Sequence, residues 1–485
     1  MEPTFDGDDD DLEEAAGDPP EDLKPSEKKA LIDLREMLEE VILSGDLIKP
    51  PPPRHHHEGR HRTRVATEGK EEEQSKEEKG EEEVLDPGGV SLWGIPLLPS
   101  KKHEGTDVIL LKFLRAQEFK AAEALEMLRR TLRWRREFGL DCAKGVCEND
   151  EEAAALAEHL RGAAYIAGRD RDGNPVCYNV YGVFKDREVY RRAVGSAERR
   201  QRLLRWRVRL MEQGIEQMSL HSGGSATLLH IIDFKDMLRP GLKELRTATR
   251  EVVAVLQDNY PEFVAKNIFL NVSFRYYAYH ALFSPFITPR TRSKFIFARS
   301  SKVTETLLKF ISAENIPVQY GGLRRENDEE FSEDNGIASE ITLKGGTSSI
   351  EIPIVEPGVT VVWDVTVVGW EVDYKEEFIP DDEGSYKILI QKERNLEECV
   401  RNSFYISEPG KLVLTITNKT YKKKRVLYRS KSKPTIPLYT LPDPLHPTVQ
   451  SPSVVKQLHE TYCAQHALEF LKFTLFPPGY CIQDC

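Results

Sequence analysis

The sequence predicts a multidomain protein in which a helical module and an α/β domain precede an all-β sandwich, behind a disordered acidic tail. Strand-like runs alternate with helical runs from residue 165 to residue 310, which is typical of helices layered on a sheet. Short β-type runs separated by Gly and Pro turns follow residue 340, as in a β-sandwich. The length of 485 residues also exceeds what one hydrophobic core usually serves.

The N-terminal tail, residues 1–86, holds an excess of negative charge. It contains 28 acidic and 12 basic side chains, a balance of −16, so the total of −12 leaves +4 for the rest of the chain. Its small apolar content cannot offset chain entropy, and we expect disorder. One exception is residues 26–44, where an amphipathic helix is expected behind a Ser26 cap. Its apolar residues recur at helical spacing: Leu31, Leu34, Leu38, Val41 and Ile42.

We expect the helical module to span residues 90–145 and the α/β domain to span residues 150–325. In the first, apolar residues suit a helical hairpin interrupted near Phe119. In the second, the strand-like runs are PVCYNVYG, TLLHIID, NIFLNV and KFIFA, and the helical runs cover 197–218, 243–256 and 304–310. Such alternation favours a sheet covered by helices.

Three ordered segments of this α/β domain carry a family resemblance. QDNYPEFVAK (257–266) runs into NIFLNV, and SKFIF (293–297) and PVQYGGL (317–323) follow. This trio resembles the signature of CRAL-TRIO lipid-transfer domains, and LLKFLRAQEF with LRWRREFGL resembles their N-terminal helical module. The resemblance implies an apolar pocket that has the sheet as its floor and is closed by a mobile gate helix. The gate falls on an aromatic-rich amphipathic segment with Tyr276, Tyr277, Tyr279, Leu282, Phe283 and Phe286.

The same resemblance implies a headgroup site. Glu262 of YPEF matches the glutamate that contacts inositol in phosphatidylinositol-transfer members, and Lys294 of SKFIF matches their paired lysine. Gln117 in RAQEF stands where the family usually has an arginine, and a neutral amide supplies neither the charge nor the bidentate fork of a guanidinium. The serine and threonine that hold phosphatidylcholine in dual-ligand members fall at Leu228 and His230, so phosphatidylcholine is not supported.

We expect the β-sandwich to span residues 338–433, and this segment resembles a second known family. VVWDVTVVGWEVDY, followed by EPGKLVLTITNKTYKKKRVLYR, resembles a GOLD domain. CRAL-TRIO followed by GOLD behind an acidic tail is the arrangement of the plant patellins, which SLWGIPLL and HIIDFKDM also resemble. The resemblance implies phosphoinositide binding, protein partners through GOLD and a role in membrane trafficking, including the cell plate in cytokinesis. It also implies a cytoplasmic protein that is peripheral on plasma, endosomal or cell-plate membranes. Residues 434–485 are a C-terminal tail of open role.

A run of positive charge lies on the last predicted GOLD strand. It consists of Lys422, Lys423, Lys424 and Arg425, with further basic residues after it. Each cation near anionic lipid contributes about 1 kcal/mol, so we expect an uncompensated cluster that contacts an anionic membrane surface. The arginines at 199–209 alternate with leucine and tryptophan, which predicts an amphipathic helix; because no recognition motif accompanies them, we expect no nucleic-acid partner.

Several classes of function find no support in the sequence. No basic segment with an apolar stretch opens the chain, and no run of about 18 apolar residues predicts a membrane span. Seven cysteines without CxxC pairing indicate reduced thiols in the cytosol. HSGGS at 221–225 lacks the GxSxG elbow, and the histidines at 55–57 lack partner ligands, so we expect neither catalysis, nor a metal, nor a cofactor. Three functions remain open: a phosphoinositide-binding lipid-transfer protein, a carrier of another apolar ligand such as a tocopherol-like molecule, and a GOLD-based membrane-recruitment scaffold.

Overall fold

The computed structural model describes residues 23–48, 89–140, 151–237, 243–273, 293–331 and 336–435. The chain divides into two compact units, which are described separately: the first contains the helical module and the α/β domain, and the second contains most of the β-sandwich. Apart from one helix, the predicted acidic tail lies outside the described residues, as does the C-terminal tail beyond residue 435. Within the described residues, no helix has the length and apolar character needed to cross a bilayer.

The helical module consists of α1 (Pro25–Leu43), α2 (Glu104–Ala116) and α3 (Ala121–Phe138), with the short strands β1 (Ser91–Leu92) and β2 (Ile95–Pro96). Helix α1 lies where the sequence predicts one, and its apolar face is buried. The expected Ser26 cap is wrong, because the capping position is Lys24, whose backbone N–H donates to the Glu27 carboxylate at 3.0 Å. Pro25 at the first helical position suits this start, since its missing N–H would have no helical acceptor.

A five-stranded sheet forms the centre of the α/β domain. Its strands are β3 (Ala164–Arg169), β4 (Pro175–Val180), β5 (Leu228–Asp233), β6 (Val264–Leu270) and β7 (Phe295–Phe297), in this spatial order. Strand β3 pairs antiparallel with β4, and all the other pairs are parallel. Because the chain moves across the sheet in one direction, right-handed crossovers place the connecting helices on a single face. The expected α/β fold is confirmed.

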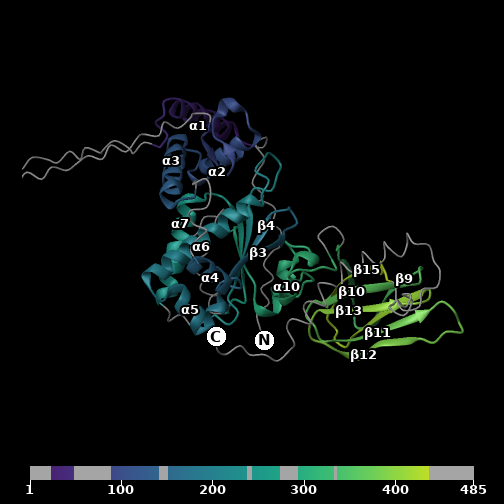
Figure 1. The fold of residues 1–485 in the computed structure, drawn as a ribbon. Coiled ribbons are helices and arrows are strands. Elements are labelled where there is room, and N and C mark those ends of the chain that lie inside the picture. The colour runs from purple at the N-terminus through teal and green to yellow at the C-terminus, as the bar shows by residue number, and fades with distance from the viewer. Residues whose placement is uncertain are drawn as a thin grey trace, which may run out of the picture. The chain divides into compact units, whose positions relative to one another are not determined.

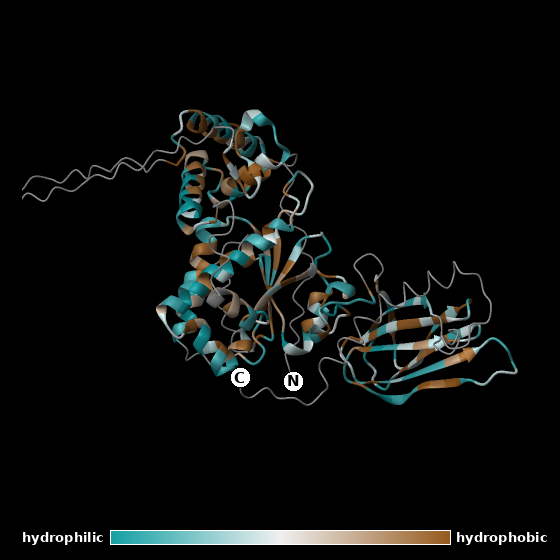
Figure 2. Cartoon of the chain, viewed as in Figure 1, coloured by the Kyte–Doolittle hydropathy of each residue, from teal (hydrophilic) through white to brown (hydrophobic). Residues whose placement is uncertain are grey.

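The helices that cover this face are α5 (Arg187–Val194), α6 (Ala197–Glu216) and α7 (Lys243–Asn259), with α4 (Glu151–His159) beside them (Figure 1). The opposite face carries α10 (Val303–Leu307) and the segment after it, where the rings of Tyr178 and Tyr320 stack at 5.5 Å. Figure 2 shows hydrophobic residues along the strands, between helices whose outer faces are largely hydrophilic.

Helix α6 is shared by two hydrophobic cores. Leu204, Val208 and Met211 belong to the core that contains the helical module. Leu203, on the neighbouring face of the same helix, belongs to a smaller core with α4, α5 and α7. This double packing explains why the helix alternates apolar residues with arginines, and it joins the helical module to the domain that holds the sheet.

The C-terminal β-sandwich, also predicted and confirmed, has two four-stranded sheets with orders β13-β10-β15-β8 and β12-β11-β14-β9. The strands are β8 (Ser339–Leu343), β9 (Gly346–Ile354), β10 (Val359–Val367), β11 (Val372–Pro380), β12 (Ile388–Leu396), β13 (Val400–Ile406), β14 (Gly410–Asn418) and β15 (Lys424–Pro434). Apolar residues alternate along β11, so Val372, Tyr374 and Phe378 are buried between the sheets.

Two carboxylates of this sandwich are fully buried. Asp364 accepts two hydrogen bonds from Arg401, at 2.7 and 2.6 Å, and one from Arg429 at 2.8 Å. Glu376 accepts from Trp363 at 3.1 Å and from Tyr374 and Asn402 at 2.9 and 2.7 Å. Both carboxylates are satisfied, as buried charge requires. They join β10 to its neighbours and β11 to the facing sheet.

Candidate functional site

The structure brings together two of the residues that the family resemblance singles out. Glu262 lies in the turn between α7 and β6, and Lys294 lies directly before β7. Because β6 and β7 are parallel neighbours, their starts meet at one edge of the sheet. The Lys294 Nζ donates to Glu262 Oε2 at 2.8 Å, and the two side chains are 25% and 22% exposed. The pair therefore remains accessible to a ligand.

The backbone of Glu262 is held in an uncommon conformation. Its φ is +54°, in the left-handed region that a non-glycine residue adopts at a cost of order 1–3 kcal/mol. The Lys112 Nζ stabilises this turn by donating to the carbonyl oxygens of Glu262 at 3.0 Å and Ala226 at 2.6 Å. Lys112 thus connects α2 of the helical module to the turn that presents the Glu262 carboxylate.

Lys112 is a buried lysine that sequence reasoning missed. Lys112 is 4% exposed, and its Nζ lies 4.1 Å from the centroid of the Phe263 ring. Burial lowers the pKa of the Lys112 amine from its ordinary value to about 7, while the Glu262 carboxylate opposes the shift and the Arg115 and Lys294 cations add to it. The amine is therefore close to losing its proton at neutral pH.

A second polar contact between the helical module and the α/β domain surrounds Glu212. Arg135 of α3 donates to both Glu212 oxygens, at 2.7 and 3.1 Å, and Trp93 donates to Oε1 at 3.3 Å. The Tyr260 hydroxyl donates to the same oxygen. Since Tyr260 belongs to the YPEF segment, this network anchors the residues that lead to Glu262.

Gln117 does not join the headgroup pair. It is the C-cap residue that follows α2, and its side-chain amide donates to the Met127 sulfur at 3.2 Å within the helical module. The position where the family usually has an arginine therefore presents no positive charge to Glu262 and Lys294. Leu228, in contrast, is buried at the start of β5, where it belongs to the hydrophobic core.

A cavity of about 160 Å³ lies between the sheet and the helices α6 and α7. Its apolar lining includes Phe184, Leu203 and Ile232, and Asn267 of β6 also lines it. Asn267 lies five residues after Glu262 and pairs across the ladder with Phe295, which follows Lys294. Strand β6, which begins just after Glu262, therefore contributes to the floor of this cavity.

The residues of the predicted gate helix lie outside the described residues. They are Tyr276, Tyr277, Tyr279, Leu282, Phe283 and Phe286. The described chain stops at Ser273, after β6, and resumes at Ser293, directly before β7. Their role as a gate stays a prediction.

A larger cleft of about 800 Å³ lies on the outside of α6, between this helix, α4 and β3. Arginines line much of it: Arg161, Arg202, Arg205 and Arg209. Arg161 pairs with Glu326 at 2.6 Å, and Arg205 donates to the Phe138 carbonyl at 3.2 Å and lies over the Phe138 ring. These contacts agree with an amphipathic helix whose arginines lie along its outer face.

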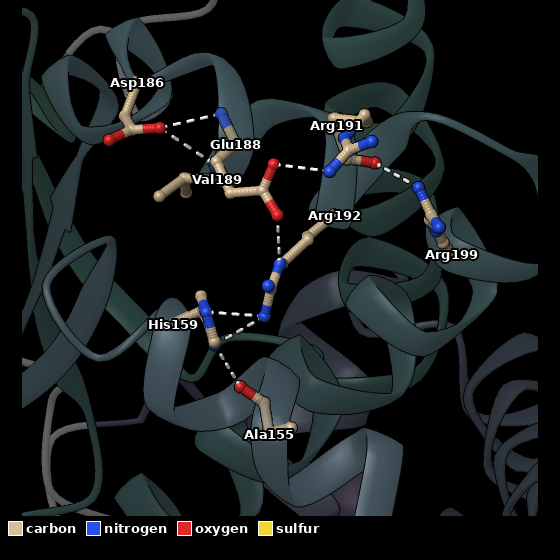
Figure 3. A network of polar contacts seen from close by, with 8 residues as sticks. All are labelled: Ala155, His159, Asp186, Glu188, Val189, Arg191, Arg192 and Arg199. Atoms are coloured by element: carbon tan, nitrogen blue, oxygen red, sulfur yellow. Dashed lines mark hydrogen bonds and ion pairs between the residues drawn. The ribbon is translucent and has the colours of Figure 1, made fainter. Parts of the chain in front are cut away.

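Surface ion pairs connect the short helices next to this cleft (Figure 3). The Glu188 carboxylate accepts from Arg191 at 2.5 Å and from Arg192 at 2.7 Å. Arg192 also contacts the His159 ring at 2.6 Å, and His159 Nδ1 contacts the Ala155 carbonyl oxygen at 2.7 Å. The two arginines lower the pKa of Glu188 through their hydrogen bonds. This exposed network joins α4 to α5.

The basic cluster on the last GOLD strand differs from the expectation. Lys422 and Lys423 are exposed in the turn before β15, but Lys424 is only 6% exposed and donates to the Gly369 carbonyl at 3.1 Å. Arg425 forms an ion pair with Glu340 on β8, with N–O distances of 2.5 and 2.7 Å. The expectation of four uncompensated charges is wrong, because alternate residues of a strand point to opposite faces. The surface charge of the run is concentrated on Lys422 and Lys423.

Comparison with known proteins agrees with this architecture. The family models matched are the CRAL/TRIO N-terminal domain over residues 70–130, the CRAL/TRIO domain over 160–322, and the Patellin-1-like C-terminal GOLD domain over 344–424. The SEC14 cytosolic factor of Eremothecium gossypii is 32% identical over 222 residues, 44% of this chain and 69% of its own.

Two patellins are more similar to this chain. Patellin-4 of Arabidopsis thaliana is 49% identical over 357 residues, 73% of this chain and 63% of its own length. This chain therefore matches less than two thirds of that relative. Patellin-6 of Arabidopsis thaliana is 43% identical over 340 residues, 69% of this chain and 80% of its own length. With these matches and the matching domain order, the chain belongs to the patellin family.

Proposed function

We propose that this chain is a peripheral membrane protein that binds and transfers lipid, and that Glu262 and Lys294 bind the inositol headgroup of a phosphoinositide. The observation that carries the proposal is the accessible ion pair between these two side chains, at 2.8 Å, next to the start of β6, which contributes Asn267 to the cavity floor. An inositol hydroxyl needs an acceptor and a phosphate needs a cation or donors, and the pair offers both. Membership of the patellin family supports lipid binding rather than catalysis.

The acyl chains supply the driving force for such binding. Each methylene that leaves water gains about 0.8 kcal/mol, so a protein that extracts a lipid must offer comparable burial. The described cavity of about 160 Å³ is smaller than the roughly 300–1,000 Å³ of pockets for small ligands. Loading a two-chain lipid therefore requires the cavity to widen. We place this opening at the gate segment around Leu282 and Phe283, where it would occur on the bilayer surface.

Membrane contact through the GOLD domain is the second part of the proposal. Lys422 and Lys423 are exposed beside Tyr421, whose side chain is fully exposed. Two cations next to an exposed aromatic ring suit the interface of an anionic membrane, where each cation contributes about 1 kcal/mol and an amphipathic ring lies at headgroup level. We place the protein on the cytoplasmic side of plasma, endosomal or cell-plate membranes, with a role in trafficking and protein partners recruited through GOLD.

One alternative ligand class is favoured by a specific observation. Gln117 replaces the usual arginine, and its amide is engaged with Met127. Without that guanidinium the headgroup site has less positive charge, so a carrier of a different apolar molecule, such as a tocopherol-like ligand, is the second candidate. A GOLD-based scaffold without transfer would instead keep its activity when the pocket is blocked.

The test is transfer of phosphatidylinositol between vesicles by the purified protein. We expect transfer by the wild type and a loss of about tenfold or more in Lys294→Met, since a charge-assisted hydrogen bond is removed. Lys302→Met is a matched control, because Lys302 is an exposed lysine on the segment after β7, with its own partner Glu305. Equal transfer by Lys294→Met and Lys302→Met would contradict the headgroup assignment.

A further inference from the structure

The arginine-lined cleft on the outer face of α6 combines positive charge with an apolar floor. Arg202, Arg205 and Arg209 recur three and four residues apart, so they lie on one face of the helix. Trp206 and Leu210 lie on the same face and are half-buried, and α4 and β3 add further apolar residues to the lining. Such a surface suits a partner that carries acidic and apolar residues side by side.

The cleft has an excess of positive charge. Of its described lining residues, four are arginines and one, Glu216, is acidic, a balance of +3. Arg161 has carboxylate partners, Glu326 at 2.6 Å and Glu158 at 3.9 Å, and all three side chains are exposed. Exposed ion pairs are weak, so an incoming carboxylate can compete for Arg161. The excess comes chiefly from the three arginines of α6.

One segment of this chain has the complementary pattern. Residues 1–22 contain 11 acidic side chains and no lysine, arginine or histidine. Within them, Asp8 to Asp11 lie between Phe5 and Leu12. The acidic run at residues 70–83 differs, because lysines interrupt it and no apolar side chain accompanies it. Of the two, residues 1–22 match a cleft that has both arginines and an apolar floor.

The length of the chain permits this contact. Helix α1 begins at Pro25, in the same compact unit as α6. An extended chain of 22 residues spans up to about 75 Å, whereas a compact unit of this size has a radius of gyration of about 20 Å. From Phe5 to Leu12 an extended chain spans up to about 25 Å. The lining residues of α6 cover 202–217, a rise of about 22 Å along the helix, so the acidic run and its apolar neighbours fit the length of the cleft.

We propose that residues 1–22 bind in this cleft, with the carboxylates of Asp8 to Asp11 on the arginines of α6 and the side chains of Phe5 and Leu12 on the apolar floor. A tethered segment reaches an effective concentration of the order of millimolar, so individually weak ion pairs suffice. The bound segment keeps these arginines from other anionic partners, including an anionic membrane surface. The contact does not depend on the headgroup site at Glu262 and Lys294.

Photo-crosslinking in the full-length protein tests this contact. The photoreactive residue p-benzoylphenylalanine replaces Phe5, and the crosslinked peptides are identified by mass spectrometry. We expect crosslinks to peptides of α6 and β3, with a yield that does not change when the protein is diluted. The yield should fall by about fivefold or more between about 10 mM and about 1 M salt, since the screening length falls from about 30 Å to about 3 Å.

Two variants assign the contact to charge, and a third is the control. Arg202→Gln with Arg209→Gln should lower the crosslink yield at low salt by about fivefold, and replacement of Asp8–Asp11 by asparagine should do the same. Arg191→Gln with Arg192→Gln removes the same charge from α5, where both arginines form exposed ion pairs (Figure 3). This control should leave the yield unchanged.

Several outcomes would overturn the proposal. Crosslinks to the basic turn at Lys422 and Lys423, or to a second copy of the chain, would place the segment elsewhere. An α6 crosslink that survives the substitutions on both sides would remove the role of charge. If Arg202→Gln with Arg209→Gln lowers co-sedimentation with anionic vesicles while no crosslink to α6 forms, the cleft binds membrane instead.

The tail variant keeps the test decisive. Should the arginine variant fail to fold by circular dichroism, the asparagine variant decides, because its substitutions lie outside the described fold. A wild type that transfers no phosphatidylinositol but crosslinks Phe5 to α6 would overturn the proposed function and leave this contact standing.

Discussion

Lys112→Met removes the buried amine that connects α2 to the turn of Glu262. The substitution leaves the carbonyl oxygens of Ala226 and Glu262 without their donor, at a cost of about 1–3 kcal/mol each. Part of this cost is offset, because methionine fills the same channel without a charge to desolvate. We expect a net loss of about 2 kcal/mol in the free energy of unfolding of this unit near pH 7.

The pH dependence of that loss is the sharper prediction. The pKa of Lys112 is about 7 in the folded protein, against an ordinary value of 10.5 when unfolded. Between these values the unfolded chain binds one proton more than the folded chain, so the free energy of unfolding rises with pH, by up to about 1.4 kcal/mol per unit. Between pH 7 and pH 9 the free energy of unfolding of wild type should therefore rise by about 2 kcal/mol more than that of Lys112→Met, in addition to the difference already present at pH 7.

Pulse proteolysis in urea, with peptides from α2 identified by mass spectrometry, measures the unfolding of this unit separately from the sandwich. Lys120→Met is the control, because Lys120 lies in the exposed turn between α2 and α3 with a side chain 57% exposed. Its profile should parallel that of the wild type. Parallel profiles for wild type and Lys112→Met from pH 7 to pH 9 would refute the assignment of a shifted, buried lysine.

Three further perturbations follow from the described contacts. Asp364→Asn leaves Arg401 and Arg429 without their buried counter-ion and should lower the free energy of unfolding of the sandwich by about 3–5 kcal/mol in urea denaturation. A change below about 1 kcal/mol would contradict a stabilising role for these ion pairs. Glu188→Gln removes exposed ion pairs and should change stability by less than about 1 kcal/mol, so a larger shift of the melting temperature would speak against an exposed network. Lys422→Glu with Lys423→Glu should weaken binding to anionic vesicles at low salt while leaving the fold intact, and unchanged co-sedimentation would remove the basic turn from the membrane contact.

Much of the fold was predictable because its signals are local. The helical run at 243–256 corresponds to α7, and NIFLNV contains the end of β6, since apolar periodicity and strand composition act over a few residues. The residues of the headgroup pair came from family resemblance rather than periodicity. Their contact could not be predicted from spacing, because it depends on β6 and β7 lying side by side in the sheet.

The features that sequence reasoning missed depend on long-range contacts. Lys112 in LLKFLRA resembles a surface residue of an amphipathic helix, and only the carbonyls of Ala226 and Glu262 show that it is buried. The charge run at 422–425 was predicted to be fully exposed and uncompensated. This was wrong because strand alternation buries Lys424 and because Glu340 of β8 pairs with Arg425. Arg207 looked like one more arginine of a solvated helix, although it lies on the side that faces the cavity.

The most direct test of the central claim is the identity of the lipid that the protein retains after exposure to mixed membrane lipids. Mass spectrometry would compare wild type, Lys294→Met and Gln117→Arg, the last of which restores the guanidinium usual in the family. We predict phosphatidylinositol in the wild type, less in Lys294→Met and at least as much in Gln117→Arg. A different ligand in the wild type, or phosphatidylinositol only in Gln117→Arg, would show that Glu262 and Lys294 do not suffice for inositol lipids.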